Sequence, residues 1–230
     1  MLALSWFKET IEDSEVVPEP ISLKTCSEFI LPKWFNPSEE LYAFLKQSWN
    51  KKYSGLFEGG KDDLESTVTS LLSFLGDNEE KYKSRCLLFC YVCCLATKDT
   101  VEAYAPKEVR HLKVLNYLEK ALNQQSEIEG KAELDRFNEL DYSPYSSGLT
   151  DSLQVYSHTV SCIFSEQTLE NIQEIFLICC EDDAIAPGDY RPIFNWLLTK
   201  AYPAAYALRL PRFIFTRNTH MPEGWQYKQA

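Results

Sequence analysis

Four of the eight cysteines of this chain stand close together, at Cys86, Cys90, Cys93 and Cys94. Thiolates ligate iron–sulfur clusters and zinc, and a Cys-x3-Cys-x2-Cys spacing can hold a cluster when its three residues converge from a loop. The same positions, i, i+4, i+7 and i+8, also form one stripe along an α-helix. The pattern therefore predicts either a reactive centre or a tightly packed core.

The residues between the cysteines favour packing. They are Leu, Leu, Phe, Tyr and Val, and they lack the polar donors that surround cluster thiolates. The spacing of Cys86, Cys90 and Cys93 is similar to that of radical S-adenosylmethionine enzymes, but no alternation of strands and helices follows it to build a barrel. In a helix the four cysteines extend over roughly 12 Å, which is too far for one cluster. We expect buried, reduced thiols and no cofactor.

The remaining cysteines and the histidines form no recognisable metal or nucleophile motif. Cys179 and Cys180 are adjacent, so a helix would point them to different sides, and His111 and His158 are isolated in the sequence. Cys26 is the only cysteine outside an apolar helix, and no histidine is identified as its partner. Glycine-rich phosphate loops, nucleophile elbows and His-Glu-x-x-His motifs are all missing. We assign no catalytic residue and no metal ligand.

An acidic segment follows the apolar helix that contains Cys179. Its acidic residues are Glu181, Asp182, Asp183 and Asp189. Negative charge at a helix C-terminus is unfavourable because of the helix dipole, so these residues are candidates for binding a basic protein. Together with His158 or His111 they would instead support metal-assisted hydrolysis. A solvated connection between two helices explains the same charges without any function.

Charge and composition narrow the classes of function. The chain has 230 residues and a formal net charge of -11, with 45% apolar and 25% charged residues. Such a surface repels nucleic acids and anionic membranes. We find neither a secretory signal nor an apolar run of ~18 residues that would cross a membrane. Together with reduced cysteines, these features predict a cytoplasmic protein.

Apolar periodicity predicts an all-α fold with roughly eight helices in antiparallel pairs. We expect one domain over residues 1–230, with an extended, proline-rich arm at 16–36 and a lobe boundary near 139–150. Similar apolar segments around 89–94 and 176–180, each followed by a helix that starts near a proline, are compatible with two pseudo-repeated helical lobes.

Capping signals and glycines set the expected helix bounds. Asn36 as N-cap and Pro37 in the first turn predict one helix, and Asp62 or Asp63 starts another that ends before Gly76. Later helices are expected at 79–97, 106–125, 153–164, from Ser165 through Cys179, at 190–200 and after Pro203. The segment 153–164 also fits an alternating strand. We further expect a short strand at 29–31, a polar continuation of the fourth helix to 138, and an irregular tail from Pro211.

Taken together, these features favour a non-enzymatic cytoplasmic binding protein that engages and neutralises a basic protein through an acidic surface. Bacterial immunity proteins, which neutralise toxins, are an analogy in composition only. The alternatives are a metal-dependent hydrolase with a composite carboxylate and histidine site, and a helical-repeat scaffold. The oligomeric state is left open.

Overall fold

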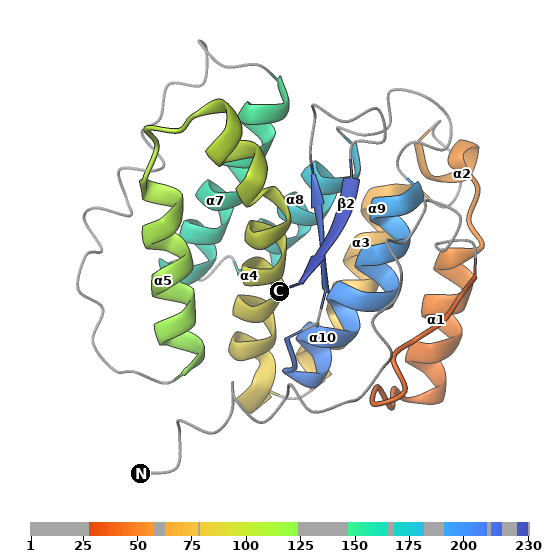
Figure 1. Ribbon diagram of the computed structural model, residues 1–230. Coiled ribbons are helices and arrows are strands. Elements are labelled where there is room, and N and C mark those ends of the chain that lie inside the picture. Colours follow the sequence, from red (N-terminus) through yellow and green to blue (C-terminus); the bar gives the residue numbers. More distant parts are fainter. Residues whose placement is uncertain are drawn as a thin grey trace.

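The structure, a computed structural model, describes residues 28–57, 63–77, 79–123, 147–164, 168–181, 191–210, 213–217 and 225–229. Within these ranges the protein is all-α in its body, as predicted, with eight helical segments and one two-stranded hairpin (Figure 1). The first seven are α1 (Glu39–Trp49), α2 (Tyr53–Phe57), α3 (Leu64–Ser73, extended by a 3-10 turn at Phe74–Asp77), α4 (Glu79–Tyr104), α5 (Arg110–Leu122), α7 (Ser147–Phe164) and α8 (Thr168–Glu181). The eighth is a continuous stretch of α9 (Arg191–Trp196), a π-helical turn (Leu197–Ala201) and α10 (Tyr202–Ala207).

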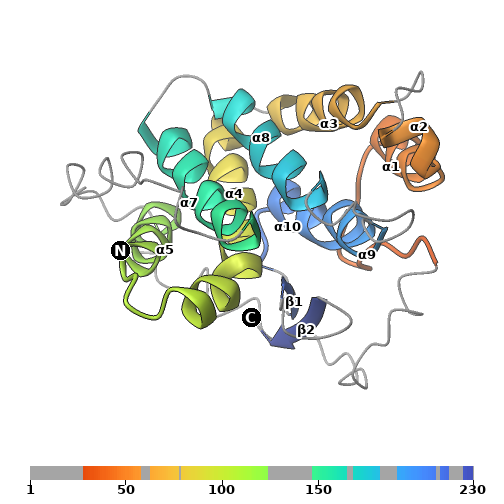
Figure 2. The same cartoon turned by 90° about the horizontal axis from the view of Figure 1, so that it is seen from above.

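Helix α4 is the centre of the bundle. It packs against α5 and α7 on one side and against α8 and α10 on the other, as the view from above shows (Figure 2). Every residue from Arg85 to Cys94 is buried, which is the pattern of a helix surrounded by others rather than one that faces solvent. The cysteine-rich segment therefore supplies the middle of the core.

The expected start of α3 is confirmed, whereas that of α1 is displaced. The backbone N–H of Ser66 donates to Asp63 Oδ1 over 2.6 Å, so Asp63 is the N-cap of α3. In α1 the cap is Ser38, whose Oγ accepts from the backbone N–H of Leu41 over 3.2 Å. The helix therefore begins two residues later than the Asn-Pro signal indicates.

One smaller expectation near α1 is wrong. Residues 29–31 form no strand; Phe29 instead packs its ring near Tyr42 and Trp49 of α1, at centroid distances of 5.8 Å each. An isolated strand without a neighbour to pair with has no ladder to stabilise it.

Helix α5 begins at Arg110, four residues later than the expected start at 106. Val109 and Leu112, which share a three-residue spacing with Leu115 and Leu118, are 55% and 42% exposed. A spacing of three residues drifts around a helix of 3.6 residues per turn, so the first two residues of this series turn outwards. The buried residues of α5 are His111, Val114, Leu115, Tyr117 and Leu118.

The C-terminal helices were expected to be separate and are joined. Pro203 has no N–H and its ring crowds the carbonyl four residues earlier. The π-helical turn accommodates it, with the N–H of Tyr202 donating to the carbonyl oxygen of Leu197, five residues back. The helix ends in a Schellman motif at Leu208, which has φ 55°. There the N–H of Leu208 donates to Ala205 O (3.1 Å) and that of Arg209 to Ala204 O (2.7 Å).

Two segments of the tail from Pro211 are regular, contrary to the expectation of an irregular tail. Strands β1 (Phe213–Arg217) and β2 (Trp225–Gln229) pair antiparallel, with Phe213 opposite Gln229 and Arg217 opposite Trp225. β1 lies beside α4 (Figure 1). Aromatic and β-branched residues fit a paired strand, but the expected irregularity overlooked that each segment has the other as its partner.

Helix α7 confirms the helical alternative for 153–164. The expected arm at 16–36 is described only from residue 28, and of the expected boundary at 139–150 only 147–150 are described, as the first turn of α7. The expected continuation of the fourth helix to 138 lies outside the described residues beyond 123. Among the described helices, none combines the length and the apolar character that crossing a membrane requires.

Candidate functional site

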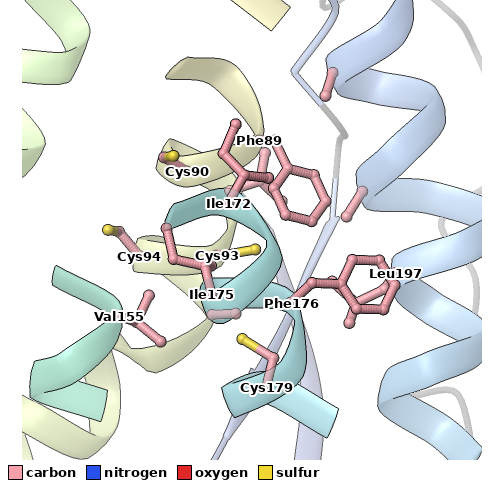
Figure 3. Packing of buried hydrophobic residues seen from close by; sticks show 14 of the residues in the cluster. Phe89, Cys90, Cys93, Cys94, Val155, Ile172, Ile175, Phe176, Cys179 and Leu197 are labelled. Carbon is pink, nitrogen blue, oxygen red and sulfur yellow. The ribbon is translucent and has the colours of Figure 1, made fainter. Parts of the chain in front are cut away.

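The cysteine cluster of α4 is part of the hydrophobic core. Cys86, Cys90, Cys93 and Cys94 are all fully buried, and Figure 3 shows three of them among apolar side chains of α7, α8 and the π-helical turn. One turn away, the rings of Phe89 and Phe176 stack with centroids 5.8 Å apart. In the described part of the chain no group of three or more His, Cys, Asp or Glu residues is arranged to hold a metal ion.

Two thiol pairs connect α4 with its neighbours: Cys93 with Cys179 of α8, and Cys90 with Cys162 of α7. Burial, and then contact with Cys179 of α8, raises the pKa of Cys93 well above its ordinary value. A hydrogen bond with Cys90, together with burial, raises the pKa of Cys162 of α7. Burial, with the nearby Cys90, raises the pKa of Cys86 to about 12. Thiolates are the reactive form of cysteine, so these positions suit packing and not nucleophilic chemistry.

The two histidines of the composite hydrolase site lie on different sides of α7. His158 belongs to α7, and its Nδ1 is 3.1 Å from Asn171 Oδ1 on α8. His111 of α5 packs edge-on against Tyr156, with ring centroids 5.8 Å apart. Residues 156 and 158 are separated by roughly 200° around the helix axis. The structure does not bring His111 and His158 to one site.

The expected acidic segment is described only at its first residue. Glu181 is the last residue of α8, whereas Asp182, Asp183 and Asp189 lie outside the described residues. The described chain nevertheless carries other carboxylates that lead towards Glu181 along the same helix, and these were not expected from the sequence.

Helices α3 and α8 lie side by side (Figure 2). Glu65 of α3 and Glu170 and Glu174 of α8 are exposed. Gln173, one residue before Glu174, donates from Nε2 to Glu65 Oε1 over 3.4 Å, so Glu65 lies beside the turn of α8 that carries Glu170 and Glu174. We name these three residues the α3–α8 acidic face.

Neither helix supplies a cation to this face. The sequences of α3 and α8 contain no Lys or Arg. Lys51, from the connection before α2, donates from Nζ to Thr67 Oγ1 over 2.8 Å and so approaches α3 at a different residue. The Glu-x3-Glu spacing of Glu170 and Glu174 could have revealed the α8 part of the face, but its junction with Glu65 depends on the packing of the two helices.

Comparison with known proteins finds no family model that matches this chain, no similar curated protein and no similar solved structure. The function is therefore inferred from the chain's own residues.

Proposed function

We propose that this protein binds a basic protein partner through the α3–α8 acidic face and does not itself catalyse a reaction. The observation that carries the proposal is the grouping of Glu65, Glu170 and Glu174 on two packed helices that contain no Lys or Arg. The net charge of -11 acts in the same direction at longer range, because it attracts basic molecules before contact.

The supporting helices are held firmly in the core. Val68 and Leu72 of α3 and Ile172 and Phe176 of α8 are fully buried. A rigid array of like charges gives up little entropy when a partner binds, and complementary charges mainly raise the association rate and the specificity. The partner that fits is a protein whose basic residues are spaced along a helix or an extended segment.

Covering such a basic surface would neutralise a partner that acts through it, as immunity proteins do to toxins. Glu181 continues the same helix beyond Glu174, and Asp182, Asp183 and Asp189 follow it in the sequence. These four residues would extend the contact surface beyond the acidic face.

A fluorescently labelled lysine decapeptide, measured by anisotropy, tests the proposal on the intact chain. The variant Glu65→Gln/Glu170→Gln/Glu174→Gln should bind this peptide about ten-fold more weakly than the parent at ~20 mM NaCl, and binding should vanish at ~300 mM. The matched control is Glu28→Gln/Glu39→Gln/Glu40→Gln, which removes the same charge from three exposed residues elsewhere.

The control variant should lose less than about two-fold in affinity, because only long-range attraction changes. Equal losses in the two variants would mean that the peptide responds to net charge alone, and the acidic face would then have no special role. Circular dichroism of both variants checks that the helices are retained.

A further inference from the structure

His111 is a buried imidazole without a hydrogen bond. Its side chain is 1% exposed, and neither Nδ1 nor Nε2 has a hydrogen-bond partner among the described residues. The nearest carboxylate oxygen, Glu102 Oε1, is 3.8 Å from Nε2, beyond hydrogen-bond distance. Buried polar groups are nearly always paired, so an unpaired one in a native structure calls for an explanation.

Charged groups approach His111 from α4 and from the connection that precedes α5. Glu102 and Lys98, one turn apart on α4, pair over 3.6 Å. Glu108 lies in the connection and holds Arg110 through its guanidinium and through its backbone N–H. Both carboxylates are therefore already paired with cations while His111 is neutral.

His111 also packs against Tyr156 of α7. The two rings meet at an interplanar angle of 77°. The Tyr156 hydroxyl donates to the backbone carbonyl oxygen of Cys94 over 2.6 Å, and burial raises the pKa of this phenol well above its ordinary value. Tyr156 therefore stays neutral and cannot balance a positive charge on His111.

Two effects oppose protonation of His111 in this position. Burial lowers the pKa of His111 below 6.5, and the nearby Lys98 lowers it further. The carboxylates of Glu102 and Glu108 raise this pKa, but burial is the larger effect. In addition, His111 is the second residue of α5, where the helix dipole is positive, and Val109 provides no side-chain cap. The closed packing of α5 is therefore suited to a neutral imidazole.

We propose that His111 is an acid-operated latch: its neutral ring holds the first turn of α5 against Tyr156, and the protonated ring moves out to Glu102 and frees that turn. The Glu102 side chain is 47% exposed, so an imidazolium beside it would be both paired and hydrated. Because the pKa of the closed form is lowered, the closed form keeps its full stability above about pH 6.5 and loses stability as the pH falls below that value. This inference is independent of the acidic face.

Hydrogen exchange of the intact chain, read by mass spectrometry and corrected for the chemical exchange rate, tests the latch. Between about pH 7.5 and about pH 5.5, amides in the first turns of α5 should lose about ten-fold in protection, while those of α3 and α8 change little. The loss should disappear in His111→Phe, which keeps a ring of similar size but cannot be protonated. The control His158→Gln, at the histidine next to Asn171, should behave like the parent.

A proton NMR titration of the histidine ring resonances, assigned with the two variants, provides a second measurement in the unaltered protein. The expected result is that His111 titrates below pH 6.5. Titration at or above this value would overturn the proposal, as would an unchanged loss of α5 protection in His111→Phe or an equal loss in all helices. If His111→Phe does not fold, His111→Gln replaces it in the exchange experiment. If neither variant folds, the titration of the parent protein decides the question.

Discussion

The guanidinium carbon of Arg85 lies 3.9 Å from the centroid of the Tyr206 ring, so the first buried turn of α4 is joined to the end of α10. Arg85 is only 5% exposed, and its Nη1 also donates to the carbonyl oxygen of Leu75 over 3.0 Å, in the turn that ends α3. Tyr206 in turn meets Phe35 edge-on at 5.7 Å. One buried cation thus connects segments from opposite ends of the chain.

Replacing Arg85 should be costly for this reason. Arg85→Met keeps an apolar stem but removes the donor to Leu75 and the cation over Tyr206, and we expect a loss of about 2–3 kcal/mol in the free energy of unfolding. Urea denaturation gives this value. A double-mutant cycle with Tyr206→Leu should show a coupling of about 1 kcal/mol. Additive effects would mean that the stacked geometry contributes nothing.

The buried cysteines should be inert towards thiol reagents in the folded protein. The seven cysteines in the described residues are all buried and free, and burial, with the nearby Cys90, raises the pKa of Cys86 to about 12. Because they are buried, these thiols are out of reach of the reagent and become reactive only on unfolding. We expect Ellman's reagent to react with at most one thiol, Cys26, before denaturant is added and with all eight afterwards. Rapid reaction of two or more native thiols would contradict the packing described for α4.

Glycine at position 208 should stabilise the protein. Leu208 has φ 55°, a conformation that costs a residue with a Cβ roughly 1 kcal/mol and costs glycine little. Its side chain is half-buried, so some packing is lost, and we expect a net gain of about 0.5 kcal/mol for Leu208→Gly. The neighbouring Ala207 is the last residue of α10 and is exposed. Ala207→Gly should therefore lower the melting temperature while Leu208→Gly raises it.

The hydroxyl of Tyr156 should contribute more stability than that of Tyr91. Tyr156 donates to a buried carbonyl oxygen, that of Cys94, which Tyr156→Phe leaves without this donor. We expect a loss of about 1–2 kcal/mol by chemical denaturation. Tyr91 donates over 2.7 Å to the exposed carboxylate of Glu119, which water can solvate when the hydroxyl is removed. Tyr91→Phe should cost less than half as much, and the reverse order would contradict these assignments.

Some helix bounds and apolar runs that depend on residues close together in the sequence were predicted correctly. Asp63 caps α3 because cap and recipient are three residues apart, and the cysteine stripe of α4 is visible as a single apolar run. The same reasoning failed at Pro203, where a proline ends most helices but a π-helical turn carries the chain through. It failed again for the hairpin, because a strand is defined by a partner that is separate in the sequence.

The acidic face illustrates why a site is harder to predict than a fold. Four carboxylates close together in the sequence, from Glu181 to Asp189, drew attention, whereas Glu65 and Glu174 are more than one hundred residues apart. Glu65 lies beside the turn of α8 that carries Glu174 only because α3 and α8 pack against the same core. The sequence pattern does not indicate which helices pack together, so it could not predict this face.

The central position of α4 also determines when the protein can fold during synthesis. Helix α4 is complete at Tyr104, but its neighbours α7, α8 and α10 end at residues 164, 181 and 207. Its fully buried segment therefore leaves the ribosome well before the helices that cover it. Until Ala207 emerges, this apolar, cysteine-rich helix has no complete set of partners, and transiently exposed apolar surface of this kind is what makes a nascent chain prone to aggregation.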